Sequence, residues 1–184
     1  MKRLWRRKHL WIVLLLLAAN GLAWLRGVAS TNLPPVEPRL SPQIEAMRQK
    51  VIARQSSGEP FAITLTEQEA AEATAWYLGR YPQIPFSNPQ VEFTPDIVTG
   101  RGMVHMFGLR APVYGRARVG LRDGTPVVTF LELGVAGVPL PGWMLRAIQS
   151  EAEAQFDFTN YDLPLIFTRL ESGEGTLTGE GVYR

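Results

Sequence analysis

The spacing of hydrophobic and polar positions changes several times along this chain, and each change marks a predicted element. An uncharged run extends from Leu10 to Leu25. In residues 42–54 and 67–79, apolar positions recur at intervals of three and four, which predicts two amphipathic helices. Most of the region from 91 to 133 alternates between apolar and polar positions, which is typical of strands with one wet face.

The alternating region predicts four antiparallel strands at 91–94, 97–107, 111–122 and 126–133, with a tight turn at Asp123-Gly124. A strand at 61–65, a helix at 141–156 and a final pair of strands at 163–170 and 175–183 complete the pattern. Residues 83–89 and 134–140 are expected to be loops. The sequence therefore predicts an α+β domain, in which helices 67–79 and 141–156 pack on an antiparallel meander sheet and a hairpin follows.

The uncharged run is preceded by a cluster of cations: Lys2, Arg3, Arg6, Arg7 and Lys8. This pattern predicts a single transmembrane helix in the cell membrane, with a cytoplasmic N-terminus and an extracytoplasmic C-terminal domain. A cleaved secretory signal is the alternative, because Gly27-Val28-Ala29 resembles a cleavage site. We therefore expect an anchor at 1–26, a Pro-rich linker with a short amphipathic helix at 27–60, and an extracytoplasmic domain at 61–184.

Charge and cysteine content narrow the possible functions. The chain has a net charge of +2, but the segment 1–26 holds six of its 19 basic residues and none of its 17 acidic ones. The remainder is acidic, so nucleic acid is not an expected partner. The absence of cysteine excludes disulfides, thiolate nucleophiles and thiolate metal sites.

The sequence offers no convincing catalytic set. Histidine, the usual acid–base residue near neutral pH, occurs only at His9 and His105. Met103, His105 and Met106 would make an incomplete copper site, because alternation in a strand places Met106 on the other face. Asp157 and Asp162 lie in an acidic stretch typical of a solvated surface. We expect a protein that is not an enzyme and has no metal or cofactor.

Two sets of side chains are candidates for binding. The first is an arginine stripe that could recognise anionic headgroups or an acidic partner, consisting of Arg101, Arg116, Arg118 and Arg122. The alternative is a solvated face balanced by Glu92 and Glu132 on neighbouring strands. The second set could line an apolar groove for a flexible ligand or could simply fill the core, and consists of Trp76, Tyr77, Phe86, Met103, Phe107, Phe130, Trp143 and Met144.

Several segments resemble those of the YpmS-like and LmeA-like bacterial membrane-anchored envelope proteins. They are Ile63-Thr64-Leu65-Thr66-Glu67-Gln68-Glu69, Pro95-Asp96-Ile97-Val98, Asp123-Gly124-Thr125-Pro126-Val127-Val128, and the run from Leu133 to Pro141. The resemblance covers residues 61–184 and implies a tubular lipid-binding (TULIP) type of domain, which holds acyl chains between a curved sheet and a helix. The chain is short for a two-lobed tube, so an open groove, or one completed by a second copy, is expected.

The expected function is that of a non-enzymatic, membrane-anchored extracytoplasmic domain that binds lipid or another amphiphile. The alternative is an accessory or assembly subunit of a larger membrane protein complex. Asn20 and Gly21 within the apolar run are compatible with helix–helix contact in such a complex.

Overall fold

The structure is a computed structural model, which describes residues 33–53, 58–106, 109–155 and 165–184. The predicted transmembrane segment lies outside these ranges, and within them no helix is both long enough and apolar enough to cross a bilayer. Phe107, Asp157 and Asp162 also lie outside the described residues.

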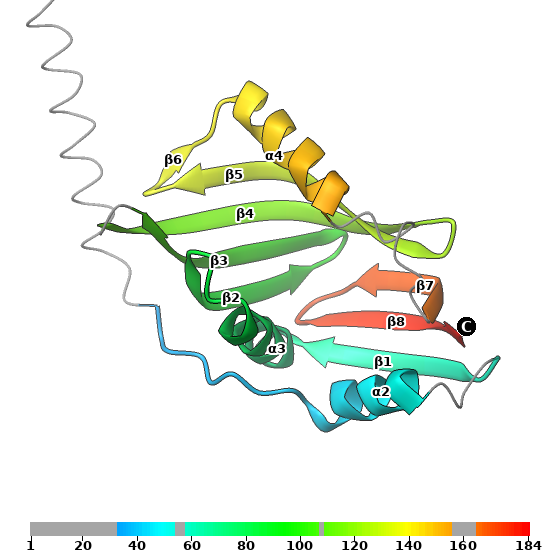
Figure 1. Ribbon diagram of the computed structural model, residues 1–184. Coiled ribbons are helices and arrows are strands. Elements are labelled where there is room, and N and C mark those ends of the chain that lie inside the picture. Colours follow the sequence, from blue (N-terminus) through cyan, green and yellow to red (C-terminus); the bar gives the residue numbers. More distant parts are fainter. Residues whose placement is uncertain (1–32, 54–57, 107–108, 156–164) are drawn as a thin grey trace, which may run out of the picture.

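The described residues form an α+β fold with antiparallel sheets, which confirms the predicted class. The elements in chain order are α2 (Pro42–Ala53), β1 (Pro60–Thr66), α3 (Glu67–Arg80), β2 (Phe86–Thr94), β3 (Ile97–Met106), β4 (Leu109–Arg122), β5 (Thr125–Val135), β6 (Val138–Pro139), α4 (Gly142–Gln155), β7 (Leu165–Ser172) and β8 (Thr176–Tyr183). In Figure 1, α4 lies at the β5–β6 end of the molecule, and α2 and α3 lie at the β1 end.

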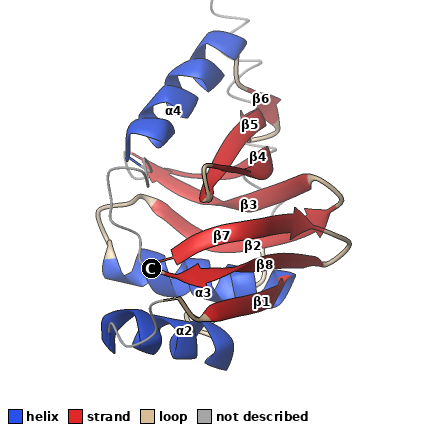
Figure 2. Ribbon diagram, turned by 90° about the vertical axis from the view of Figure 1, so that its right-hand side faces the viewer, coloured by secondary structure: helices blue, strands red, loops and turns tan. Residues whose placement is uncertain are grey.

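The strands divide into two sheets rather than one. A five-stranded meander has the order β2-β3-β4-β5-β6, and a three-stranded sheet has the order β1-β8-β7. The hairpin tips join the two sheets through backbone hydrogen bonds: Phe167 N–H donates to Gly124 O at 2.8 Å and Gly175 N–H donates to Phe93 O at 3.0 Å. Figure 2 shows the small sheet lying across the lower part of the meander.

Two tight turns lie at opposite ends of β5. Asp123 and Gly124 both have positive φ, 53° and 77°, as the predicted turn requires. Ala136 and Gly137 do the same, with φ of 52° and 80°, so β5 runs on to Val135 and β6 pairs with it. The prediction of a loop over 134–140 is therefore wrong in part. An alanine with positive φ costs about 1–2 kcal/mol. Alanine is therefore not a usual turn residue, and the sequence did not indicate a turn at this position.

The loop expected at 83–89 is also shorter than predicted, because β2 begins at Phe86 and pairs with β3 there. A register shift between Ser87 and Gln90 interrupts the pairing. Such a bulge breaks the regular alternation of side chains, which explains why residue spacing alone did not indicate a strand before Val91.

The small sheet carries an aromatic cluster. The Phe61 ring meets the Phe167 ring edge to face, with centroids 5.2 Å apart, and the Tyr183 ring at 5.4 Å. The chain can pass this close only because Gly181 has no side chain, since a Cβ there would lie 2.8 Å from the Phe61 ring. Phe93, on the neighbouring meander, is 3% exposed. The core thus sits where the two sheets meet.

The Pro-rich linker lies along α3 instead of extending freely from the domain. The Arg39 guanidinium donates two hydrogen bonds to the Glu72 carboxylate, at 3.0 and 3.1 Å, and Arg39 N–H donates to Glu72 O. Farther along, the Gln90 side chain donates to Pro34 O at 3.1 Å. As predicted, α3 packs on the meander, chiefly on β2. Its buried residues are Ala71 and Glu72, and Tyr77 is exposed.

We predict that Thr66→Ala destabilises the domain by about 1 kcal/mol, because Thr66 caps α3. Its hydroxyl accepts a hydrogen bond from Glu69 N–H at 3.3 Å, and the Glu69 carboxylate accepts one from Thr66 N–H at 3.0 Å. Urea unfolding followed by circular dichroism measures the change. Thr74→Ala, inside the same helix, is the control and should be close to neutral. Equal effects of the two substitutions would contradict the capping role.

We also predict that the linker contact weakens in acid. Hydrogen bonds from Gln68 and from Arg39 lower the pKa of Glu72 below its ordinary 4.5. A lowered pKa stabilises the fold above the ordinary value, and that stabilisation is lost as the pH falls through the lowered one. Glu72→Gln should therefore lose less stability than the wild type between neutral pH and about pH 3. Glu37→Gln, a substitution on the linker itself, is the control and should follow the wild type. Parallel curves of stability against pH for all three proteins would contradict the role of Glu72.

Candidate ligand-binding groove

The meander has one apolar and one polar face, as the alternation along β4 predicted. Val113, Gly115, Ala117 and Val119 belong to the apolar face, which bears a groove of about 470 Å³. Its floor comes from β3, β4 and β5. Phe86 of β2 contributes at one side, and at the other are Leu140 and Ile148, which belong to the segment after β6 and to α4.

The groove is hollow because its floor lacks side chains at the centre. Gly100 of β3 lies directly opposite Gly115 of β4 in the register. A Cβ on Gly115 would lie 2.6 Å from the Leu133 side chain, so a larger residue does not fit there without rearrangement. A Cβ on Gly100 would meet nothing within 4 Å and would point into open space. Gly100 therefore leaves the floor of the groove open, whereas the space above Gly115 is occupied by the Leu133 side chain.

The helix α4 is held at the edge of the sheet. Because β6 has only two residues, the outer edge of β5 before Gly134 has no strand partner. The Gln149 side chain takes that place: its Oε1 accepts from Phe130 N–H at 2.8 Å, and its Nε2 donates to Val128 O at 3.0 Å. An amide side chain thus pairs with the edge as a strand would. Ile148 stays 36% exposed and the groove stays open.

The lining of the groove suits a hydrocarbon ligand. Its exposed surface is almost entirely apolar, and the one residue among its lining with an ionisable side chain is Tyr114. The volume falls in the range of roughly 300–1,000 Å³ that is common for small-molecule sites. Within the described ranges no group of three or more His, Asp or Glu side chains could hold a metal ion. The groove can therefore bind apolar matter but offers no obvious catalytic group.

Of the eight predicted groove residues, the structure brings Phe86 and Phe130 to the groove. Trp76 and Tyr77 lie on α3, where Arg80 stacks over the Trp76 ring at 3.7 Å and Tyr81 packs against Tyr77. Trp76 therefore does not join Phe130 in one cavity.

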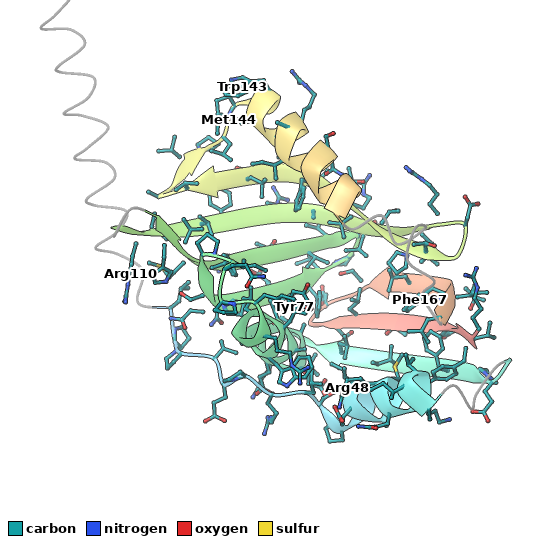
Figure 3. All side chains as sticks on the ribbon, viewed as in Figure 1. Arg48, Tyr77, Arg110, Trp143, Met144 and Phe167 are labelled. Carbon is teal, nitrogen blue, oxygen red and sulfur yellow. The ribbon has the colours of Figure 1, made fainter. Side chains whose placement is uncertain are left out.

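Three other described members of that set, Met103, Trp143 and Met144, also lie away from the groove lining. Met103 occupies the opposite face of β3, because it alternates with the groove residue Gly100 at odd spacing. Trp143 and Met144 begin α4 and are not part of the lining (Figure 3). Sequence reasoning missed Gly100, Gly115 and Ile148, although glycines at apolar positions of two adjacent strands were a usable signal.

The four arginines of the stripe differ in whether a carboxylate lies beside them. On the polar face, Arg101 pairs with Glu92 at 3.0 Å and Arg116 approaches Glu132 at 3.7 Å. Both line a second cavity of about 600 Å³. Tyr114 donates to Glu132 at 2.7 Å, and this hydrogen bond raises the pKa of Tyr114.

Arg101 and Arg116 thus each have a carboxylate partner on a neighbouring strand, as in the alternative of a balanced sheet face. Arg118 and Arg122 are exposed and make no ion pair with a described residue. His105 shares a hydrogen bond of 2.7 Å with Ser87. Among the described residues no carboxylate contacts His105, so a Ser-His-Asp arrangement is not formed here. The apolar groove is therefore the stronger candidate site.

We predict that Gln149→Ala loosens α4 from the sheet, because Phe130 N–H and Val128 O lose their partner. Hydrogen–deuterium exchange of a peptide that covers β5 should become faster by up to about tenfold, which corresponds to one net hydrogen bond. Ser150→Ala, at an exposed position of the same helix, is the control and should leave exchange unchanged. Unchanged exchange of β5 in the Gln149 variant would contradict the pairing.

Comparison with protein families, curated proteins and solved structures gives no significant match to this chain. The resemblance to the YpmS-like and LmeA-like envelope proteins therefore stays a prediction, and the function must be argued from the geometry of the groove.

Proposed function

We propose that this protein binds the hydrocarbon part of a lipid or a similar amphiphile in the groove between α4 and the apolar face of the meander. The observation that carries the proposal is a trough of about 470 Å³ whose exposed lining is almost purely apolar. Such a surface is costly to leave in water, and each buried methylene of a ligand contributes about 0.8 kcal/mol. A ligand that covers the trough removes this penalty.

The extent of the groove sets the size of the ligand that it could bind. Its lining extends from Phe86 on β2 to Ile148 on α4. That path crosses the three gaps between neighbouring strands from β2 to β5, a distance of roughly 14 Å at 4.7–4.9 Å for each gap. Apolar side chains offer no directional contact along it, so the site would select for hydrocarbon character and length and not for a particular polar group.

The proposal includes a membrane anchor ahead of the domain. The run from Leu10 to Leu25 and the cations before it favour a transmembrane helix that places the domain outside the cytoplasm. An anchored domain would find its ligand in the adjacent leaflet. The absence of an evident catalytic group at the groove supports a binding role, such as holding or passing on a lipid, and not a chemical one.

We predict that partly filling the groove weakens lipid binding strongly. Gly100→Leu adds a side chain in the open space of the floor and would displace two or three methylenes of a ligand, about 2 kcal/mol or roughly thirtyfold in affinity. Gly120→Leu is the matched control: it lies in a strand, its Cβ would also meet nothing within 4 Å, and it alternates with Val119 onto the opposite face.

The measurement is native mass spectrometry of the full chain, gently extracted and offered phospholipids. We expect bound lipid in the wild type and in Gly120→Leu, and much less of it in Gly100→Leu. Wild-type protein that carries no lipid and takes up none would refute the proposal. A stable stoichiometric protein partner in place of lipid would favour the accessory-subunit alternative.

A further inference from the structure

The described chain begins beside the turn that leads into α4. Leu33 lines the same cavity as Ala136 and Gly137, the turn residues between β5 and β6. Figure 1 shows the start of the described linker at the same side of the molecule as this turn. The two features are far apart in sequence but neighbours in space. The described linker therefore begins next to the β5–β6 turn.

The linker contacts fix this exit point. Arg39 is paired with Glu72, and Pro34 O accepts from Gln90, so the linker lies against the domain at both ends of this stretch. Only residues 27–32 separate Leu33 from the end of the predicted anchor at Arg26. Fully extended, the chain from Arg26 to Leu33 reaches about 25 Å at most. A membrane anchor in 1–26 would hold this flank of the domain close to the bilayer.

The same flank carries the side chains that a bilayer surface would accept. Trp143, at the start of α4, is 66% exposed, and Val138 on β6 is 46% exposed. Arg146 turns back toward the start of α4, with Nη1 3.6 Å from the point where a side chain on Gly142 would begin. Arg110 is exposed and has no ion pair with a described residue. Figure 3 shows Trp143 and Arg110 on the flank opposite Phe167.

We propose that this flank, made of Leu33, Arg110, Val138, Trp143 and Arg146, docks on the phospholipid surface, with the Trp143 indole at headgroup level. An indole combines an apolar body with a polar N–H and settles at that depth. The two arginines would meet anionic headgroups. The inference rests on the anchor of the proposed function, but it concerns orientation and not the occupancy of the groove.

The docking would also set where a ligand enters. Val135 and Leu140, which flank β6 in sequence, both line the groove. One end of the groove would then lie next to the bilayer, and a hydrocarbon tail could pass from leaflet to groove without crossing water.

The chain has no cysteine, so single cysteines can be labelled without background. We would place nitroxide labels at Trp143→Cys and Val138→Cys in the full chain, reconstituted in nanodiscs of mixed zwitterionic and anionic phospholipid. The matched controls are Tyr77→Cys and Ile52→Cys, exposed apolar positions on α3 and α2. Power-saturation measurements compare access to oxygen, which enriches in lipid, with access to a water-soluble nickel chelate.

We expect positions 143 and 138 to show a several-fold higher ratio of oxygen to nickel access than positions 77 and 52. Equal ratios at all four positions, or a higher ratio at the controls, would overturn the docking. Labels at 143 and 138 shielded from both agents would also overturn it, because a protein partner would then cover the flank. None of these outcomes depends on lipid in the groove, which the Gly100→Leu comparison tests separately.

Discussion

The Gln149 side chain ties α4 to the edge of the meander. This position of the helix leaves the groove open. A helix with an apolar stripe normally packs on the open face of a sheet and fills it. Here Gln149 bonds to the backbone of β5 at Phe130 and Val128, which draws the helix to the sheet edge. The apolar face is left partly uncovered as a result. The same contact satisfies an exposed edge that would otherwise invite pairing with another strand.

The two faces of the meander differ in how they are stabilised in water. On the polar face, Arg101 and Arg116 are matched by Glu92 and Glu132, so this side needs no ligand to be stable in water. On the apolar face, Gly100 lacks the side chain that would otherwise extend into the groove. The polar face of the sheet thus has its charges paired, whereas the apolar face leaves hydrophobic surface exposed to water. This difference is the physical basis for proposing that a ligand binds to the apolar face.

Local rules predicted much of the fold, and long-range contacts account for what they missed. The Asp123-Gly124 turn and the alternation along β4 depend on neighbouring residues, and the structure has both. The turn at Ala136 is held by a bond to Pro112 O, which no local pattern announces. Large aromatic residues were a poor guide to the groove, because its shape follows from missing side chains.

The small sheet has a consequence for the order in which the domain forms. Its central strand is β8, the last strand of the described chain, which pairs with β1 at one side and β7 at the other. During synthesis, β1 must therefore wait for more than a hundred residues before its partner exists, whereas the meander can assemble from sequential hairpins. A chain that stops before Thr176 would present β1 and β7 with open edges and Phe61 in water.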